Sequence, residues 1–384
     1  MHLQCSPTSA GRTMLRGLRA VAIACSVFGL PLALQAATVI DTGQSITTEI
    51  APYVALSAAP QYQASGYVTA AVPGGFDLGS GTLIAPDWVL TAAHVVTQQT
   101  TVGNQTVTTI DAPASVSFGQ GAQRSPALVG ADAVTQVIVM PGWNFNIEAG
   151  NDLALLKLAT PVTGVTPATL YPTSLPVPVG QTATAVGYGT TGTGLTGNTA
   201  ANSYDATTPS NSTGFYERMG VNNVIDAAGP ALTSGPTPGN PSATTYYSFA
   251  GLASDYLLTD FDRPGVSSAS LMGDTTPLTY EGASTPGDSG GGLFVAVGGK
   301  TYLAGVTDFV GGFGNNATST SSTVFGYYGD YDGYTFVGAS NTAAFIDSVV
   351  APEPSTFVLA GLGAAGLLWQ ARRRLRGPKR ATFR

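Results

Sequence analysis

Three short segments hold residue types that together could carry out nucleophilic catalysis. Ser289 lies in the run GDSGG at 287–291, whose glycines permit backbone conformations closed to other residues and leave the hydroxyl exposed. A serine needs a base to take its proton and a third group to orient that base. His94 is one of two histidines, and the other, His2, lies in a segment that we expect to be removed. Asp152, at the head of an apolar strand, is the acid that we expect to orient His94.

The same glycine-rich run could hold the negative charge that forms during the reaction. The N–H groups of Gly287 and Ser289 could point together at a developing oxyanion. Asp132 and Asp111 are the alternative acids if Asp152 does not reach His94, although neither opens an Asp-Leu-Ala-Leu strand. The predicted chemistry is attack of a serine oxygen on a carbonyl carbon, with a histidine moving the proton.

These segments resemble the trypsin/chymotrypsin-like serine endopeptidases. The matching runs are TAAH at 91–94, NDLALL at 151–156 and GDSGG at 287–291, in the order His, Asp, Ser, with further likeness in VGYG at 186–189 and GYTFV at 333–337. The resemblance implies two six-stranded antiparallel β-barrels packed together, with the active site between them and a short C-terminal helix. It implies peptide-bond hydrolysis by a triad of His94, Asp152 and Ser289, with no metal and no organic cofactor.

The residue pattern predicts short strands over most of the chain, so the expected class is all-β. Residues 66–158, 180–189 and 293–310 are rich in Val, Thr and Leu and are broken by glycine-containing turns. A helix is expected at 341–350. Residues from about 190 to 281 form a loop-rich insertion, in which 246–249 and 256–261 could be strands. This insertion either shapes the substrate cleft or is a solvated loop.

The resemblance also implies where a substrate pocket lies. Its base would be Ala283, and its wall would run over 306–311, which includes Asp308 and Phe309. An uncharged base favours small or apolar substrate residues. Asp332 could line the same pocket and restore a preference for basic residues, so both preferences stay open.

The N-terminus, residues 1–36, has the layout of a secretory signal peptide. Three arginines precede an apolar core over 20–34, and small residues follow at Ala36 and Ala37. We expect signal peptidase to cut near Ala36. A retained anchor is the alternative, but the apolar core is shorter than the ~20 residues that a spanning helix needs. Both cysteines lie in this segment, so the protease domain, residues 37–350, has no disulfides.

The activation event stays open at this point. Many proteases of the resembled family become active when a new N-terminal ammonium pairs with the acid beside the serine, which here is Asp288. The usual activation sequence is missing. Either the signal-cleaved N-terminus pairs with Asp288, or a later cut supplies the ammonium, or Asp288 has another partner.

The C-terminus, residues 351–384, resembles the PEP-CTERM sorting signal of bacteria. Pro-Glu-Pro at 352–354 is followed by an apolar run at 357–369, expected as a helix, and by a basic tail. The resemblance implies an exosortase-type enzyme as a partner and at least transient membrane contact through the apolar segment. We expect export across the inner membrane, followed by residence at the cell surface, in the extracellular matrix or in the medium. A plain tail anchor is the alternative.

The charge balance excludes one class of partner. Between residues 37 and 351, five basic residues face 21 acidic ones. Nucleic-acid binding requires basic patches that contact phosphates, so no nucleic acid is expected. The sequence predicts a secreted, surface-sorted serine endopeptidase that acts on proteins or peptides. A catalytically inactive surface or matrix-binding protein with a protease-like fold, or an esterase or self-processing enzyme with the same triad, are the alternatives.

Overall fold

The computed structural model describes residues 37–350, apart from gaps at 73–74, 103–104, 125–130, 147–148, 199–215, 230–231, 238–239, 249–254, 268–269, 271, 274 and 312–324. The chain divides into two compact units, Met1–Ala343 and Ala344–Arg384. The predicted signal peptide and sorting signal, including the apolar helix at 357–369, lie outside the described residues. Within the described ranges, no helix is both long and apolar enough to cross a membrane.

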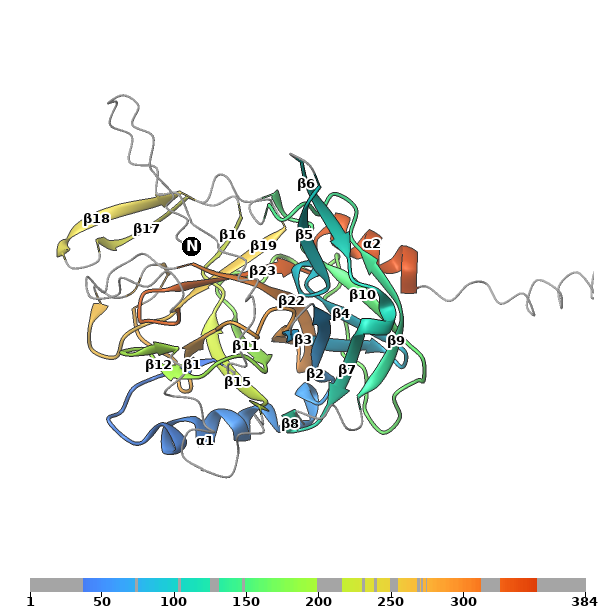
Figure 1. The fold of residues 1–384 in the computed structure, drawn as a ribbon. Coiled ribbons are helices and arrows are strands. Elements are labelled where there is room, and N and C mark those ends of the chain that lie inside the picture. The colour runs from blue at the N-terminus through green and yellow to red at the C-terminus, as the bar shows by residue number, and fades with distance from the viewer. Residues whose placement is uncertain are drawn as a thin grey trace, which may run out of the picture. The chain divides into compact units, whose positions relative to one another are not determined.

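Six antiparallel strands close into a barrel in the first half of the chain (Figure 1). In barrel order they are β10 (Ala154–Leu158), β4 (Trp88–Thr91), β3 (Gly75–Ala85), β2 (Ser65–Val72), β7 (Val116–Gln120) and β9 (Asp132–Val139). Fully buried side chains from these strands fill the interior, among them Val68, Leu83, Leu90, Phe118 and Leu155. Closure pairs every strand on both sides and leaves no edge. The first predicted barrel is confirmed.

Seven strands form the second large sheet. Their order is β15 (Met219–Val224), β11 (Thr182–Gly187), β21 (Gly292–Val297), β22 (Lys300–Gly311), β23 (Tyr331–Phe336), β19 (Tyr256–Asp260) and β16 (Ala227–Ala228). The two edge strands β15 and β16 are separated in sequence by only Ile225 and Asp226. The N–H of Ile225 donates to the carbonyl of Gln181 on one side, whereas the N–H of Asp226 donates to Leu258 on the other.

This change of partner explains how the second sheet differs from the prediction. One chain segment borders both edges, so the sheet curls into a half-barrel that is not closed by a continuous hydrogen-bonded ladder. Counted as a single interrupted strand, β15 and β16 complete the six strands that were predicted. The all-β class and the chymotrypsin-like architecture are confirmed, with a curled half-barrel in place of the second closed barrel.

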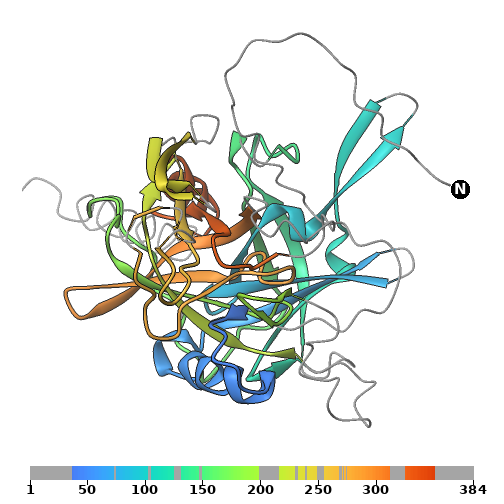
Figure 2. The same cartoon turned by 90° about the vertical axis from the view of Figure 1, so that its left-hand side faces the viewer.

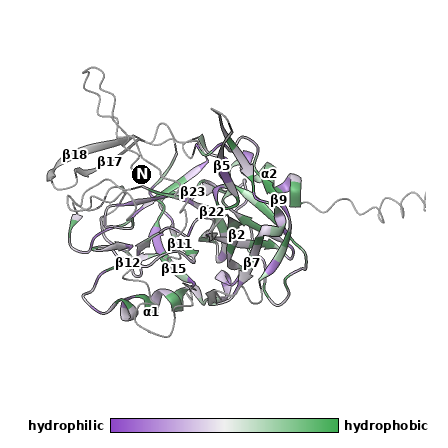
Figure 3. Cartoon of the chain, in the orientation of Figure 1, coloured by the Kyte–Doolittle hydropathy of each residue, from purple (hydrophilic) through white to green (hydrophobic). Residues whose placement is uncertain are grey.

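Smaller pairings surround the two large sheets. A four-stranded sheet contains β13 (Gly197–Asn198), β12 (Gly192–Thr193), β1 (Thr38–Val39) and β20 (Gly282–Ala283). Two-stranded pairs are β5 (Thr97–Val102) with β6 (Gln105–Ile110), β8 (Gln123–Arg124) with β14 (Tyr216–Glu217), and β17 (Leu232–Thr237) with β18 (Asn240–Ser248). The β5–β6 hairpin projects from the barrel (Figure 2). Hydrophobic and hydrophilic residues are mixed along the strands (Figure 3), as expected where one face of a strand is buried.

Two α-helices and three short 3-10 helices occur in the described part of the chain. They are α1 (Ile46–Ser57), α2 (Ser340–Val350), η1 (Pro60–Tyr62), η2 (Ala93–Val96) and η3 (Pro113–Ser115). The predicted helix at 341–350 is confirmed as α2. Sequence reasoning missed α1, which contains Pro52 and is only weakly amphipathic, so the local pattern argues against a helix. Tertiary packing stabilises α1, because its Ile50 and Tyr53 belong to the core of the second sheet.

The insertion at about 190–281 contributes strands to the second sheet. It supplies three strands of the second sheet, β15, β16 and β19. The strand predicted at 256–261 is confirmed as β19, and β18 includes the residues expected to be extended at 246–248. Without this segment, the second sheet would lack both of its edges.

Candidate active site

Strand pairing brings His94 and Asp152 together. His94 lies on η2, which begins two residues after β4 ends at Thr91, and Asp152 lies just before β10. Strands β4 and β10 are antiparallel partners, with Ala154 opposite Thr91. The residues just past the end of one strand therefore meet the residues just before the start of the other. This register follows from the apolar faces of both strands, which are buried in the first barrel.

Two hydrogen bonds join the pair. The backbone N–H of His94 donates to Asp152 Oδ1 at 2.8 Å, and His94 Nδ1 lies 2.6 Å from Asp152 Oδ2. The Asp152 side chain is completely buried, whereas 14% of the His94 side chain is exposed. A proton on Nδ1 satisfies the buried carboxylate, so the other ring nitrogen, Nε2, is left to accept a proton. This is the tautomer that a general base needs.

The pKa values of the two groups shift in opposite directions. Burial lowers the pKa of His94, but the charge and hydrogen bond of Asp152 and the charge of Asp77 outweigh it, so the pKa is raised. Burial raises the pKa of Asp152, but the charge and hydrogen bonds of His94 outweigh it, so the pKa is lowered. The carboxyl group therefore stays ionised at neutral pH and stabilises an imidazolium beside it.

Tight turns on both sides of Ser289 shape the segment that carries it. The N–H of Asp288 donates to the carbonyl of Thr285 at 2.9 Å, and the N–H of Gly291 donates to the carbonyl of Asp288 at 2.7 Å. Gly287 has a φ of 101°, which is left-handed backbone that favours glycine. Ser289 itself is half-buried. The glycines of the motif are therefore needed for the backbone that presents the serine.

The Ser289 segment packs against the chain that leads to His94. A Cβ atom on Gly290 would lie 2.2 Å from Thr91 Oγ1 and 3.0 Å from the nitrogen of Ala92, so only glycine fits there. Thr91 and Ala92 come directly before η2. The structure thus places the segment of Ser289 against the segment of His94, although the two residues are far apart in sequence.

Ser80 links these segments, and sequence reasoning missed it. Its Oγ donates to the carbonyl of Gly287 at 2.9 Å and accepts the N–H of Tyr188 at 2.9 Å. Its N–H donates to the carbonyl of Ser289 at 2.7 Å, and its carbonyl accepts the hydroxyl of Thr91 at 2.7 Å. Its position on β3 between two glycines is a sequence signal for close backbone approach. Ser80 ties the first barrel to the backbone around Ser289.

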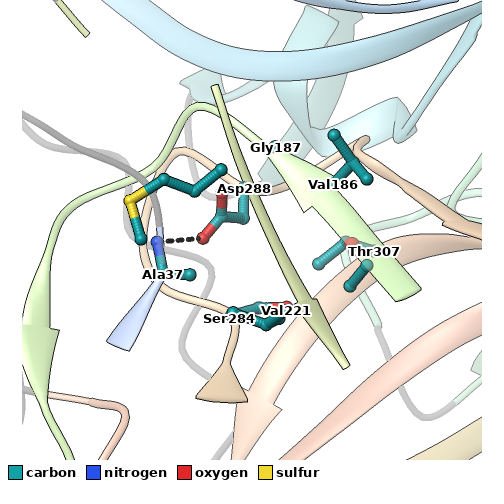
Figure 4. A pocket seen from close by; sticks show the side chains of 9 residues that line it. Ala37, Val186, Gly187, Val221, Ser284, Asp288 and Thr307 are labelled. Atoms are coloured by element: carbon teal, nitrogen blue, oxygen red, sulfur yellow. Dashed lines mark hydrogen bonds between the residues drawn. The ribbon is translucent and has the colours of Figure 1, made fainter. Parts of the chain in front are cut away.

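A buried hydrogen bond joins Ala37 to Asp288, the residue before Ser289 in the sequence (Figure 4). The backbone nitrogen of Ala37 donates to Asp288 Oδ2 at 3.0 Å and to Thr285 Oγ1 at 3.2 Å. Burial raises the pKa of Asp288 to about 6, although hydrogen bonds from its neighbours oppose the rise. Ala37 has a φ of 61°, in the left-handed region. A small cavity beside this contact is lined by Ala37, Ala185, Val186, Gly187, Met219, Val221, Ser284, Asp288 and Thr307.

The VGYG run at 186–189 has a structural role beside Asp288. A Cβ atom on Gly187 would lie 2.3 Å from Asp288 Oδ1, and one on Gly189 would lie 2.6 Å from Asp288 Oδ2. The N–H of Gly189 donates to Asp288 Oδ1 at 2.8 Å. The two glycines therefore make room for a carboxylate, and Tyr188 between them is completely buried.

The residues predicted for a substrate pocket are all buried, and the structure separates them into two environments. Asp332 Oδ2 accepts the N–H of Ser284, the residue after Ala283, at 2.8 Å, so Ala283 and Asp332 are neighbours. Burial raises the pKa of Asp332 to about 7. The Phe309 ring packs edge-to-face on Tyr256 at 5.5 Å. Asp308 lies beside His94 and Asp152 instead, with Oδ1 4.0 Å from His94 Nδ1. The pocket itself stays a prediction.

One cluster in the described ranges has the residue types of a metal site. Single side-chain atoms of His94, Asp152 and Asp308 all lie within 4.8 Å of one another. His94 Nδ1 and Asp152 Oδ2 are already joined at hydrogen-bond distance, and Asp308 accepts a hydrogen bond from Tyr256. We interpret the cluster as a hydrogen-bonded group of a base and two acids, and we assign no metal to it.

Comparisons with known proteins agree with this geometry. Residues 54–229 match the family model for trypsin, and residues 350–374 match the PEP-CTERM protein-sorting motif. The chain is 27% identical over 260 residues to chymotrypsin-like elastase family member 1 of Felis catus, an alignment that covers 64% of this chain and 72% of that protein. It is 37% identical over 84 residues to the proteins of the same name from Canis lupus familiaris and Homo sapiens, covering 22% of this chain and 28% of each relative.

The predicted resemblances are therefore confirmed. The chain carries a region similar to the trypsin family over residues 54–229 and a C-terminal PEP-CTERM motif over residues 350–374. The protease domain implies protein substrates, and the sorting motif implies export in a bacterium and processing by an exosortase.

Proposed function

We propose that this chain is an active serine endopeptidase with His94, Asp152 and Ser289 as its catalytic triad. Ser289 Oγ attacks the scissile carbonyl carbon while His94 Nε2 takes its proton. The amine then leaves with that proton, and water repeats the sequence on the acyl-enzyme. Asp152 holds the ring in one tautomer and stabilises the imidazolium. The observation that carries the proposal is the contact between His94 and the completely buried Asp152 at 2.6 Å.

We assign the oxyanion hole to the N–H groups of Gly287 and Ser289. Neither group donates a hydrogen bond to any residue in the described part of the chain. The turn at 285–288 and the bonds from Ser80 fix the backbone on both sides of these groups. Donors that are already in place when charge develops give the largest electrostatic benefit.

The signal-cleaved N-terminus is our candidate for the activating group. Ala37 is the residue that cleavage near Ala36 would expose, and its nitrogen already contacts the buried carboxyl of Asp288. Cleavage would convert an amide N–H into an ammonium at that position and give Asp288 a counter-charge. On this proposal, the cut by signal peptidase removes the signal peptide and also generates the ammonium that activates the enzyme. The exosortase-type enzyme then processes the C-terminus.

For the substrate pocket we propose a preference for small or apolar residues before the cut at neutral pH and below. Ala283 brings no charge, and Asp332 is buried, hydrogen-bonded and easily protonated, since its pKa lies near 7. Ionisation of Asp332 at higher pH would make basic residues acceptable as well.

The test is labelling of the exported full chain with a fluorophosphonate probe, beside Ser289→Ala and His94→Ala. Ser117→Ala is the matched control, because Ser117 is a half-buried serine of the first barrel whose hydroxyl pairs with Thr69. We expect labelling and casein cleavage in the wild type and in the control, and neither in the Ser289 variant. Wild type without labelling would indicate an inactive surface protein. Labelling with ester turnover but no casein cleavage would indicate an esterase.

A further inference from the structure

A second buried acid lies beside the His94–Asp152 pair, and triad chemistry alone does not require one there. Only 3% of Asp308 is exposed, and its Oδ1 lies 4.0 Å from His94 Nδ1. A side-chain oxygen of Asp308 also lies within 4.8 Å of a side-chain oxygen of Asp152. Two ionised carboxylates at such a distance in a dry interior would repel strongly.

A β-bulge directs Asp308 to this position. On β22, Thr307 pairs with Tyr334 and Phe309 pairs with Gly333, so Asp308 is the extra residue that has no partner on β23. A bulge bends the strand and re-aims the side chain of the unpaired residue. Without the bulge, the alternation of side chains along β22 would be continuous through residues 307–309. The position of the Asp308 side chain is therefore set by the strand pairing of the second sheet.

The hydrogen bonds of Asp308 are complete only if one oxygen carries a proton. Its Oδ2 accepts the hydroxyl of Tyr256 at 2.5 Å and that of Thr335 at 3.3 Å. Its Oδ1 is buried and has no donor among the described residues. An oxygen of Asp152 lies within 4.8 Å of an oxygen of Asp308, and the ionised carboxylate of Asp152 can only accept hydrogen bonds. A proton on Oδ1 would satisfy both carboxyl groups at once.

We propose that Asp308 is held in its neutral form and donates a hydrogen bond from Oδ1 to Asp152, which makes it a positioning residue for the catalytic pair. This inference rests on the proposed serine protease function. The two acids then carry one negative charge between them, located on Asp152. Hydrogen bonds run from Tyr256 to Asp308 and from Asp308 to Asp152, and Asp152 accepts a further one from His94 Nδ1. Burial and the charge of Asp152 raise the pKa of Asp308, in agreement with the geometry.

The groups around Asp308 determine the pH at which it loses its proton and stops donating to Asp152. They are Asp152 before β10, His94 on η2, Tyr256 on β19 and the Thr335 hydroxyl on β23. Asp255 lies farther out and acts on Tyr256. Ionisation of Asp308 at alkaline pH would replace a hydrogen bond with a repulsion and push Asp152 out of line with His94. We therefore expect wild-type kcat to fall on the alkaline side when Asp308 loses its proton.

The kinetic test compares Asp308→Asn with Asp308→Ala in the exported full chain. The asparagine amide can donate to Asp152 and its oxygen can accept from Tyr256, so kcat/KM should stay within about fivefold of wild type, with the acid limb in place and the alkaline fall removed. Alanine leaves buried polar groups without partners, so kcat should drop on the order of tenfold while KM changes little. The proposal is overturned if the asparagine variant is as slow as the alanine variant. It is equally overturned if the acid limb of the asparagine variant moves to lower pH, as removal of a negative charge near His94 would require.

A second measurement does not depend on activity. At pH 8 the infrared difference spectrum of wild type minus Asp308→Asn should show a protonated carboxyl band. Asp330→Asn is the matched control, because Asp330 is another buried acid of the same region, has a pKa of about 7 and accepts the N–H groups of Gly326 and Tyr327. It should remove an ionised carboxylate band and leave activity unchanged. An ionised band in the Asp308 difference would refute the proposal, whereas a protonated band in a chain that no probe labels would refute only the proposed function.

Discussion

The nitrogen of Ala37 donates a 3.0 Å hydrogen bond to the carboxylate of Asp288, a residue 251 positions later in the chain. Ala37 is the first described residue, and β1 directly after it pairs with β12 and β20. The start of the protease domain is therefore anchored beside the residue that precedes Ser289. If cleavage near Ala36 takes place as proposed, this contact connects the new N-terminus to the backbone that presents Ser289.

The contact predicts that the position of the first residue controls activity. A chain that begins at Ala37 should have a kcat/KM at pH 8 at least tenfold higher than one that carries a single extra residue, because only a free ammonium neutralises the buried Asp288. Chains with either start can be prepared by removal of a cleavable tag. Equal activity of the two chains would show that Asp288 needs no N-terminal charge.

The same pair predicts how stability depends on pH. In the uncleaved chain the pKa of Asp288 is raised from 3.8 to about 6, so the stabilisation it provides is present below about 3.8 and is lost as pH rises through about 6. The Tm of the extended chain should fall over that window relative to the chain that begins at Ala37. Asp288→Asn in the extended chain should abolish the difference in slope, as measured by thermal unfolding at pH 4 to 8.

Replacement of Asp152 by asparagine should lower kcat by about 10⁴, the effect of the same replacement in the serine protease template. The amide oxygen would accept the backbone N–H of His94, so the amide NH2 faces Nδ1 and donates to it. The ring proton then moves to Nε2, and the neutral amide does not stabilise an imidazolium. Asp132→Asn is the control, since Asp132 is a half-buried acid of β9 and, with Asp111, is one of the two alternative acids from the sequence. A comparable loss in the control would move the orienting role to Asp132.

The acid limb of kcat/KM should lie above the ordinary pKa of histidine. His94 must be neutral to take a proton, and its pKa is raised, so activity is lost at a higher pH than for an unperturbed imidazole. The charge of Asp77 contributes to the rise, so Asp77→Asn should move the acid limb to lower pH while leaving kcat at high pH nearly unchanged. Rate profiles from pH 5 to 10 would measure both effects.

Removal of the Ser80 hydroxyl should lower both stability and turnover. Ser80→Ala leaves the carbonyl of Gly287 and the N–H of Tyr188 buried without partners, which costs about 1–3 kcal/mol of unfolding free energy. Because Gly287 is part of the proposed oxyanion hole, kcat should fall more than KM changes. Urea unfolding beside Ser117→Ala would test the stability term. A loss of stability without any loss of kcat would show that Ser80 does not position the oxyanion hole.

The buried acid near Ala283 predicts pH-dependent specificity. Burial raises the pKa of Asp332 to about 7, so Asp332 should be mostly protonated at pH 6 and mostly ionised at pH 8. The ratio of cleavage after Arg or Lys to cleavage after Ala or Val should rise across this range, as read from a peptide library. In Asp332→Asn the ratio should stay constant and low. A ratio that is equally pH-dependent in the variant would remove Asp332 from the pocket.

The sequence by itself determined the features that depend on local pattern. Turn residues and β-rich segments gave the all-β class, and the runs around His94, Asp152 and Ser289 identified the family resemblance. The glycines at 287–291 and 186–189 carried information because a backbone or a carboxylate approaches them too closely for any side chain. The apolar and basic runs at the two ends of the chain indicated export and sorting, because each of these signals is a continuous stretch of sequence.

Only the tertiary structure decided the features that join distant segments. The contacts of Ala37 with Asp288 and of Ser80 with Gly287 depend on how the sheets pack, and no spacing in the sequence encodes them. The resemblance places Asp308 in the wall of a substrate pocket, and only the structure shows the one-residue bulge in β22 and the 4.0 Å between Asp308 Oδ1 and His94 Nδ1. Successive side chains of a strand point to opposite faces, so a single bulge changes the direction of a side chain and the site that it reaches. The sequence alone does not show where a bulge interrupts the strand pairing.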